Sequence, residues 1–176
     1  MKEHELRILI NRDEIGKTID ALAKKIDADY SGKKILLVGV LKGAAFFLVD
    51  LARAISLPLE IDFVEVSSYG NETESSGEIK LIKDIKRDLS DYHVLIVEDI
   101  LDSGLTLQYL SNFFKMKNPL SVKSIVLFYK NKSDNKKRSS VDYVGLNIPD
   151  DFVVGYGLDY AEKYRNLKDL YIVSFV

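Results

Sequence analysis

The chain alternates between unbroken apolar runs and stretches with helical spacing. Ile35 to Leu41 and Val94 to Val97 are runs with no polar face, which is typical of strands buried on both sides in a parallel sheet covered by helices. After the second run, apolar residues recur at spacings of three, four and seven, the pattern of a helix. The first run is followed in the same way by Phe47, Leu48, Leu51 and Ile55. Strand–helix units of this kind predict a mostly parallel sheet.

Other segments extend this alternation. Asn11 is a helix-capping residue type, and the apolar spacing after it predicts a helix up to about Asp29. Leu59 to Ser67 alternates apolar and acidic side chains, as a strand does. The remaining predicted strands are 6–10, 79–82, 121–129, 143–148 and 172–176. We predict one α/β domain, residues 1–176, with a central mostly parallel sheet flanked by helices, a small hood and a flexible strand-loop-strand flap.

The second apolar run leads directly into a group of acids and small residues. Glu98 and Asp99 follow the run, Asp102 comes after two more apolar residues, and Ser103-Gly104-Leu105-Thr106 opens the predicted helix. Open α/β sheets bind ligands outside the carboxyl ends of their strands, and a helix N-terminus favours an anion. The stretch therefore predicts a phosphate site beside three carboxylates, which suit ribose hydroxyls and a shared metal ion.

Composition narrows the function classes. The 176 residues include 25 basic and 27 acidic side chains, for a net charge of -2, so no charge bias points to nucleic acid or an anionic membrane. Cysteine is absent, which excludes disulfides, a thiolate zinc site and a cysteine nucleophile. The first residues have no apolar signal core, and no run approaches the ~18 apolar residues that span a bilayer. We expect a cytoplasmic protein.

The acidic stretch resembles the phosphoribosyl-diphosphate binding fingerprint of the type I phosphoribosyltransferases. Four further segments are similar to the hypoxanthine-guanine phosphoribosyltransferases: Leu41-Lys42-Gly43, Ser67-Ser68-Tyr69-Gly70, Lys130, and Phe152 to Asp159 followed by Arg165. The resemblance implies transfer of a 5-phosphoribosyl group from phosphoribosyl diphosphate to hypoxanthine and/or guanine. IMP or GMP and diphosphate would be the products, with Mg²⁺ as cofactor. Relatives are commonly dimers or tetramers, so a homo-oligomer is implied as well.

The resemblance also implies roles around the ribose and its 5'-phosphate. Asp102 would be the general acid or base at purine N7, although an Asp here could instead cap the helix. Glu98 and Asp99 would hold the ribose hydroxyls, directly or through Mg²⁺, although either could merely cap the turn. The 5'-phosphate cradle would be Ser103, Gly104, Leu105 and Thr106.

Further implied roles concern the diphosphate and the purine. The diphosphate would contact Leu41, Lys42, Gly43 and Arg165. The purine would contact three residues: Lys130 would donate to the 6-oxo group, the ring of Phe152 would stack on the base, and the backbone of Val153 would read its edge. Asp159, also on the purine side, would be a second Mg²⁺ ligand. Ser68 and Tyr69 would belong to a mobile loop that closes over the site. By composition alone, residues 68–77 are equally a lid or an exposed hairpin tip. The sequence leaves open the choice among hypoxanthine, guanine and xanthine, and whether the Leu41–Lys42 peptide bond is cis.

Two other classes remain as alternatives. An RNA-binding regulator with a retained or vestigial site would need a basic face, and the one dense basic cluster is Lys132 to Arg138. A nicotinamide dehydrogenase would need G-x-G-x-x-G after the first strand, which this sequence lacks. The enzyme of purine salvage is the reading that the motifs favour.

Overall fold

The central sheet carries six strands in the order β4-β3-β2-β5-β6-β7. The computed structural model describes residues 2–69, 78–130 and 141–175. The strands are β2 (Ile35–Leu41), β3 (Leu59–Tyr69), β4 (Glu78–Lys83), β5 (His93–Leu101), β6 (Ser121–Lys130) and β7 (Tyr143–Ile148). All neighbours pair in parallel except β3 and β4. The predicted mostly parallel sheet is confirmed.

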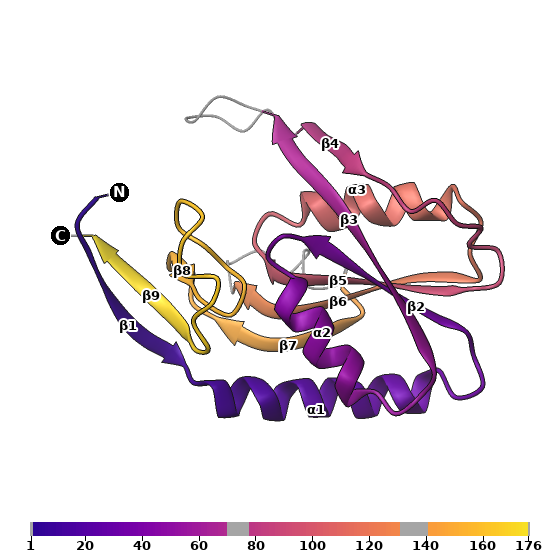
Figure 1. Cartoon of the computed structure of the whole chain (residues 1–176), viewed down its shortest axis with the longest axis horizontal. Helices are drawn as coiled ribbons and strands as arrows, with labels where there is room; N and C mark the ends of the chain where they lie inside the picture. The colour runs from indigo at the N-terminus through magenta and orange to yellow at the C-terminus, as the bar shows by residue number, and fades with distance from the viewer. Residues whose placement is uncertain (1, 70–77, 131–140, 176) are drawn as a thin grey trace.

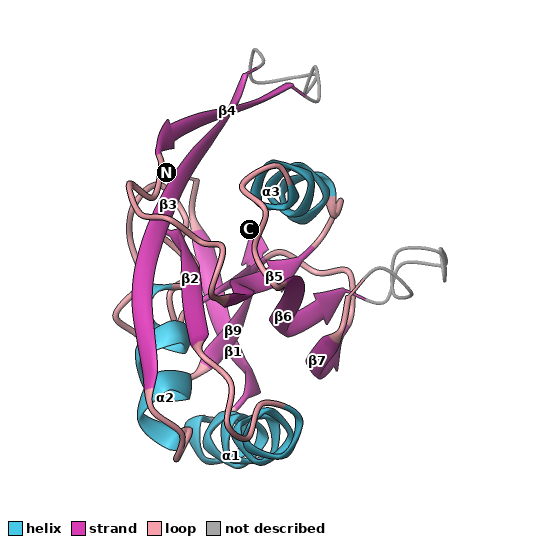
Figure 2. Ribbon diagram, turned by 90° about the vertical axis from the view of Figure 1, so that its right-hand side faces the viewer, coloured by secondary structure: helices cyan, strands magenta, loops and turns pink. Residues whose placement is uncertain are grey.

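Helices cover both faces of this sheet. They are α1 (Arg12–Asp29), α2 (Ala45–Ala54) and α3 (Leu105–Lys115). Figures 1 and 2 show α1 and α2 on one side of the sheet and α3 on the other. The side chain of Asn11 accepts a hydrogen bond from the backbone of Glu14 at 3.0 Å, so the predicted cap of α1 is confirmed. None of the helices in residues 2–69, 78–130 and 141–175 is long and apolar enough to span a membrane.

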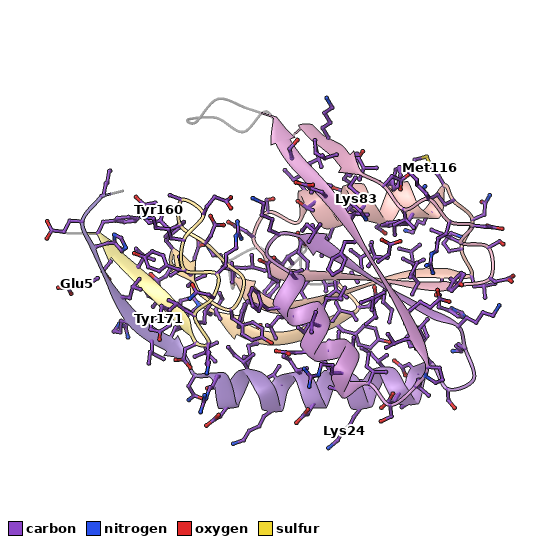
Figure 3. All side chains as sticks on the ribbon, in the orientation of Figure 1. Glu5, Lys24, Lys83, Met116, Tyr160 and Tyr171 are labelled. Carbon is purple, nitrogen blue, oxygen red and sulfur yellow. The ribbon has the colours of Figure 1, made fainter. Side chains whose placement is uncertain are left out.

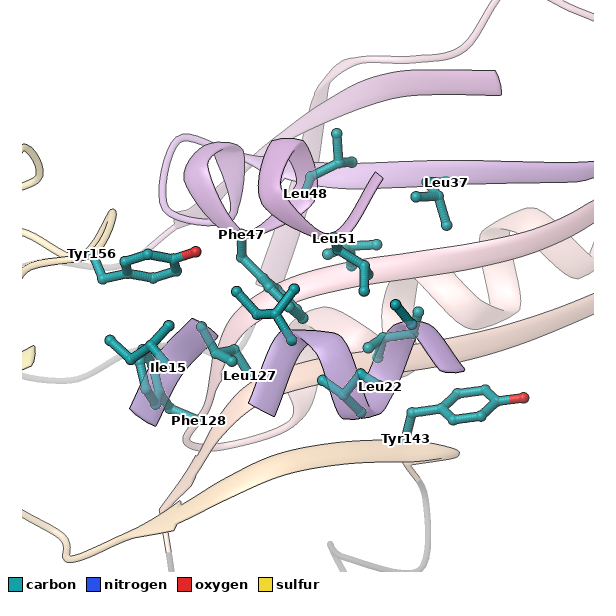
Figure 4. Close-up of a cluster of buried hydrophobic side chains, with 14 of the residues drawn as sticks. Ile15, Leu22, Leu37, Phe47, Leu48, Leu51, Leu127, Phe128, Tyr143 and Tyr156 are labelled. Atoms are coloured by element: carbon teal, nitrogen blue, oxygen red, sulfur yellow. The ribbon is translucent and has the colours of Figure 1, made fainter. Parts of the chain in front are cut away.

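Two hydrophobic clusters fix the sheet between its helices. On the side of α1 and α2, Phe47, Leu48 and Leu51 pack against apolar side chains of α1 and of the strands (Figure 4). On the opposite side, Leu110 and Phe114 of α3 pack against β2, β5 and β6. Because side chains of β2 and β5 enter both clusters, the carboxyl ends of these strands are held in a fixed position.

A second, antiparallel sheet forms the hood. Its strands are β1 (His4–Ile10), β9 (Leu170–Phe175) and β8 (Val153–Val154), in the order β1-β9-β8. Figure 1 shows β1 and β9 side by side, with both ends of the chain close together. The sequence predicted a first and a last strand and a small hood, but not that these two strands pair, because such distant pairing leaves no local pattern.

Candidate active site

The functional segments meet at one edge of the central sheet. β2, β5 and β6 are neighbouring parallel strands, so Leu41, Leu101 and Lys130 all lie at their carboxyl ends. The sequence placed the end of the β5 strand at Val97, which is wrong by four residues. Pairing with β6 continues to Leu101, so the acids lie within the strand; backbone pairing tolerates a charged side chain that points toward a site.

A stack of three residues, joined by two close contacts, forms the centre of this edge. A methyl group added to Gly43 would overlap Oδ2 of Asp99 far inside van der Waals contact, and one added to Gly157 would overlap the carbonyl oxygen of Gly43 in the same way. The peptide bond between Leu41 and Lys42 is cis, which the sequence left open. Asp99, Gly43 and Gly157, from three separate segments, are thus packed directly on one another.

Burial sets the electrostatics of the two adjacent acids. Glu98 is only 9% exposed, and burial raises its pKa well above the usual range, with a further increase from the neighbouring Asp99 carboxylate. Burial also raises the pKa of Asp99, to about 6, although its hydrogen bond with the backbone of Ile100 and the charge of Arg165 act in the opposite direction. The site therefore holds two carboxyl groups with raised pKa values, and a nearby positive charge would favour their ionised forms.

We expect Glu98→Gln to stabilise the protein at pH 7 by about 1–3 kcal/mol, because the variant replaces one buried ionisable carboxyl group with a neutral amide. An unfolded Glu titrates near pH 4.3 and the folded Glu98 titrates higher, so between these values the native state holds more protons. The contribution of Glu98 to the free energy of unfolding is therefore complete below the pKa of the unfolded state. It is lost as pH rises through the pKa of Glu98 in the folded state. Urea unfolding from pH 5 to pH 8, without metal ions, should show a flatter pH dependence in the variant.

The exposed substitution Glu5→Gln is the control for this experiment and should behave as wild type. Equal stability of wild type and Glu98→Gln at pH 7 would contradict the raised pKa of Glu98.

A cluster of opposite charges borders the stack. Arg165 donates to the carbonyl of Gly157 at 2.8 Å and pairs with Asp159 Oδ1 at 2.7 Å. Glu162 accepts from Lys42 Nζ at 2.9 Å and lies 3.4 Å from Arg165 Nη2. The structure therefore brings together Lys42, Asp159 and Arg165, three of the residues that the resemblance assigns to the site. Glu162 was not predicted, because its partner Lys42 is 120 residues away in the sequence and gives no local signal.

A second charged group lies at the end of β6. The Lys130 side chain is 12% exposed, and its Nζ lies 3.8 Å from Asp102 Oδ2 and 3.5 Å from Asp150 Oδ1. The N-cap residue of α3 is Gly104, with φ 78° and no side-chain cap, so the alternative that Asp102 caps this helix is wrong. Asp150 was not predicted, since an acid after a proline has the composition of an ordinary turn.

The small-residue loop opens onto a cavity. Gly104 adopts a positive φ that favours glycine, and the backbone N–H of Leu105 donates to Ser103 Oγ at 3.4 Å. Ser103, Gly104 and Leu105 line a cavity of about 660 Å³ that continues along α3. Thr106 lies in the first turn of that helix. The backbone N–H groups of this turn are free of helical partners and suit a phosphate.

Two of the predicted purine contacts, Phe152 and Val153, lie at the hood. The Phe152 ring is 44% exposed and meets Tyr160 edge-on at a centroid distance of 5.6 Å and Phe175 at 6.0 Å. Figure 3 shows Tyr160 in the hood, next to β8. Val153 is buried and pairs with Ile172. Ser68 and Tyr69 end β3, but their side chains, the rest of the 70–77 segment and the Lys132–Arg138 cluster lie outside the described residues.

The acids of the edge fit a hard cation only in part. Within the ranges that the structure describes, no group of three or more acids or histidines could hold a metal ion by itself. Asp159 is near enough to raise the pKa of Asp99 by its charge. Mg²⁺ is usually bound by one or two carboxylates together with substrate phosphates and water, so Glu98, Asp99 and Asp159 fit this cation as partial ligands.

Comparison with known proteins identifies the family. A model of the phosphoribosyl transferase domain matches residues 9–161. A hypoxanthine-guanine phosphoribosyltransferase of Bacillus subtilis is 47% identical over 95% of this chain and 93% of its own length. The bifunctional protein TilS/HprT of Listeria innocua is 50% identical over 92% of this chain, which spans 25% of that protein. A crystal structure of a Bacillus anthracis hypoxanthine-guanine phosphoribosyltransferase has a TM-score of 0.87 at 42% identity, and the match covers 98% of this chain and 100% of that one.

The chain belongs to the phosphoribosyl transferase family, with the type I fold. Within it, the chain is a member of the hypoxanthine-guanine phosphoribosyltransferases. The implied family is confirmed, and the dehydrogenase alternative is wrong.

Proposed function

We propose that the protein is a purine salvage enzyme that transfers the 5-phosphoribosyl group of phosphoribosyl diphosphate to hypoxanthine and/or guanine. The products are IMP or GMP and diphosphate. The observation that carries the proposal is the meeting, at one sheet edge, of the Asp102–Lys130 pair with the packed Asp99, Gly43 and Gly157. The Asp102–Lys130 pair presents a proton acceptor and a cationic donor. The second group presents the carboxylate of Asp99 next to the backbone of Gly43 and Gly157.

Phosphoribosyl diphosphate would be held by three groups of this chain. The backbone and hydroxyls of Ser103 to Thr106 bind the 5'-phosphate at the start of α3. Glu98 and Asp99 accept hydrogen bonds from the ribose hydroxyls. Lys42 and the planar fork of Arg165 bind the diphosphate. Bound Mg²⁺, with Glu98, Asp99 and Asp159 as ligands, would neutralise charge on the leaving diphosphate.

The purine side supplies orientation and proton transfer. Phe152 stacks on the base, the backbone of Val153 reads its edge, and Lys130 donates to the 6-oxo oxygen. N9 attacks C1 of the ribose, the bond from C1 to the diphosphate breaks with its electron pair, and the carboxylate of Asp102 takes the proton at N7. The transition state resembles an oxocarbenium ion, which water must not reach; Ser68 and Tyr69 belong to the loop that would exclude it.

The test is diphosphate release from phosphoribosyl diphosphate and Mg²⁺, with hypoxanthine, guanine, xanthine and adenine offered separately to wild type and Lys130→Met. We expect wild type to use one or more 6-oxopurines and not adenine, whose 6-amino group accepts poorly. The variant should lose about 10- to 100-fold in kcat/KM for 6-oxopurines, because it lacks a charged hydrogen bond.

Lys123→Met, on the same strand but away from its carboxyl end, is the matched control and should retain wild-type turnover. Absence of turnover with every purine would refute the salvage function and favour the RNA-binding alternative. If Lys130→Met used the four purines with the same kcat/KM values as wild type, Lys130 would not be a purine-binding residue.

Three further expectations belong to the proposal. The cysteine-free sequence is suited to a reducing cytoplasm. We also expect the protein to assemble as a dimer or tetramer. The third expectation is that residues 1–176 form a single domain. The purines that wild type turns over will define its preference among hypoxanthine, guanine and xanthine.

A further inference from the structure

The segment after β8 contains a strained position that carries a charged side chain. Ala161, Glu162 and Tyr164 have φ values of 51°, 63° and 75°. L-residues rarely adopt this left-handed region, and glycine adopts it without strain. Strained non-glycine residues persist where the surrounding structure fixes them, and they are frequent at functional sites. At Glu162 the side chain makes contacts that glycine could not.

Glu162 joins two segments that are far apart in the sequence, 120 residues separating it from Lys42. Its Oε2 accepts from Lys42 Nζ at 2.9 Å, and its Oε1 lies 3.4 Å from Arg165 Nη2. Its backbone N–H donates to Asp159 Oδ2 at 2.8 Å, while the other oxygen of Asp159 pairs with Arg165. The hydrogen bond from Lys42 holds the pKa of Glu162 below its usual range, so the carboxylate is charged at neutral pH. One carboxylate thus lies between two cations.

We propose that Glu162 is a positioning residue that holds the Lys42 ammonium and the Arg165 guanidinium in a fixed arrangement for binding diphosphate. The inference rests on the proposed function, which makes these two cations the diphosphate contacts. Lys and Arg side chains are flexible, and ordering them before binding lowers the entropic cost of association. Two cations drawn together also repel each other, and an intervening carboxylate offsets this repulsion.

A contrary effect has to be weighed, because a carboxylate repels diphosphate. The Glu162 side chain is 65% exposed, so water and salt screen this repulsion. We therefore expect the gain from ordering to exceed the repulsion.

The test is calorimetric titration of wild type and three variants with inorganic diphosphate and with phosphoribosyl diphosphate, each with Mg²⁺. Glu162→Gly removes the carboxylate and relieves the backbone strain. Ala161→Gly relieves the strain at the adjacent position and leaves every ion pair in place. Glu162→Gln keeps the size of the side chain and removes its charge.

We expect Glu162→Gly to bind diphosphate about three- to tenfold more weakly than wild type, the range for two exposed ion pairs. Glu162→Gln should be intermediate and Ala161→Gly unchanged. In turnover, KM for phosphoribosyl diphosphate should rise in Glu162→Gly while KM for hypoxanthine stays constant. Its thermal midpoint should equal or exceed that of wild type, which separates a loss of positioning from a loss of folding.

Equal or tighter diphosphate binding by Glu162→Gly and Glu162→Gln would overturn the inference, because repulsion would then dominate. An equal weakening in Ala161→Gly would also overturn it, since the backbone would be the cause. If wild type binds diphosphate and the variants weaken as expected but no purine is turned over, the proposed function fails and the role of Glu162 stands. Absence of diphosphate binding by wild type would refute both.

Discussion

Replacement of Asp102 by Asn is expected to lower kcat about 10²- to 10⁴-fold, the usual contribution of a positioned general acid or base. The amide has the shape of the carboxyl group but cannot take a proton from the purine. KM for phosphoribosyl diphosphate should change little, because the residues proposed to bind it are separate from Asp102. Steady-state kinetics with hypoxanthine and with guanine measure both constants.

The structure makes this experiment easier to interpret. Asp102 does not cap α3, so the substitution should not remove a helix cap. Asp150 lies 3.5 Å from Lys130, so the cation should keep a partner in the variant. Asp151→Asn, an exposed neighbour, is the matched control and should turn over as wild type does. Normal turnover in Asp102→Asn, with an unchanged thermal midpoint, would show that another group handles the proton.

The strands and helices could be predicted because their signals are local. The apolar run Ile35 to Leu41 is β2 residue for residue, and the spacing of Leu107, Leu110 and Phe114 marks the buried face of α3. The end of β5 was predicted too early, since charged residues interrupt an apolar run without interrupting backbone pairing. Periodicity reports which side chains are buried, and a strand that enters a polar site continues beyond its apolar residues.

The site was predictable in its parts but not in its contacts. The resemblance of the motifs to a known family pointed to Lys42, Asp102 and Arg165. The partners Asp150 and Glu162 depend on how distant segments pack, and neither has a pattern of its own. The same holds for Tyr160, whose ring supports the proposed purine-stacking Phe152. Residues that orient a site through tertiary contacts can be recognised only from the three-dimensional structure.

Gly43 gives the second large effect, because its missing side chain makes room for Asp99. We expect Gly43→Ala to lower kcat/KM for phosphoribosyl diphosphate about 10²-fold or more, since a displacement of about 1 Å in a positioned group can have an effect of this size. Overpacking should also reduce the free energy of unfolding by about 1–3 kcal/mol. Initial rates at varied phosphoribosyl diphosphate and urea unfolding measure the two effects.

Gly16→Ala is the matched control for the same chemical change. A methyl group at Gly16, in the exposed part of α1, meets nothing within 4 Å, so this variant should keep its activity and gain about 0.5–1 kcal/mol of stability. Wild-type kinetics in Gly43→Ala would contradict the close packing of Asp99 on the loop after β2.

The double variant Gly43→Ala with Asp99→Ala separates folding from function. Shortening Asp99 removes the carboxylate oxygen that the new methyl group would overlap, so unfolding stability should recover toward that of Asp99→Ala alone. Activity should not recover, because the carboxylate that we assign to the ribose is then absent. Recovery of both stability and activity would mean that Gly43 matters only for packing. Recovery of stability alone would support the role of the Gly43–Asp99 contact in positioning the acid that we assign to the ribose.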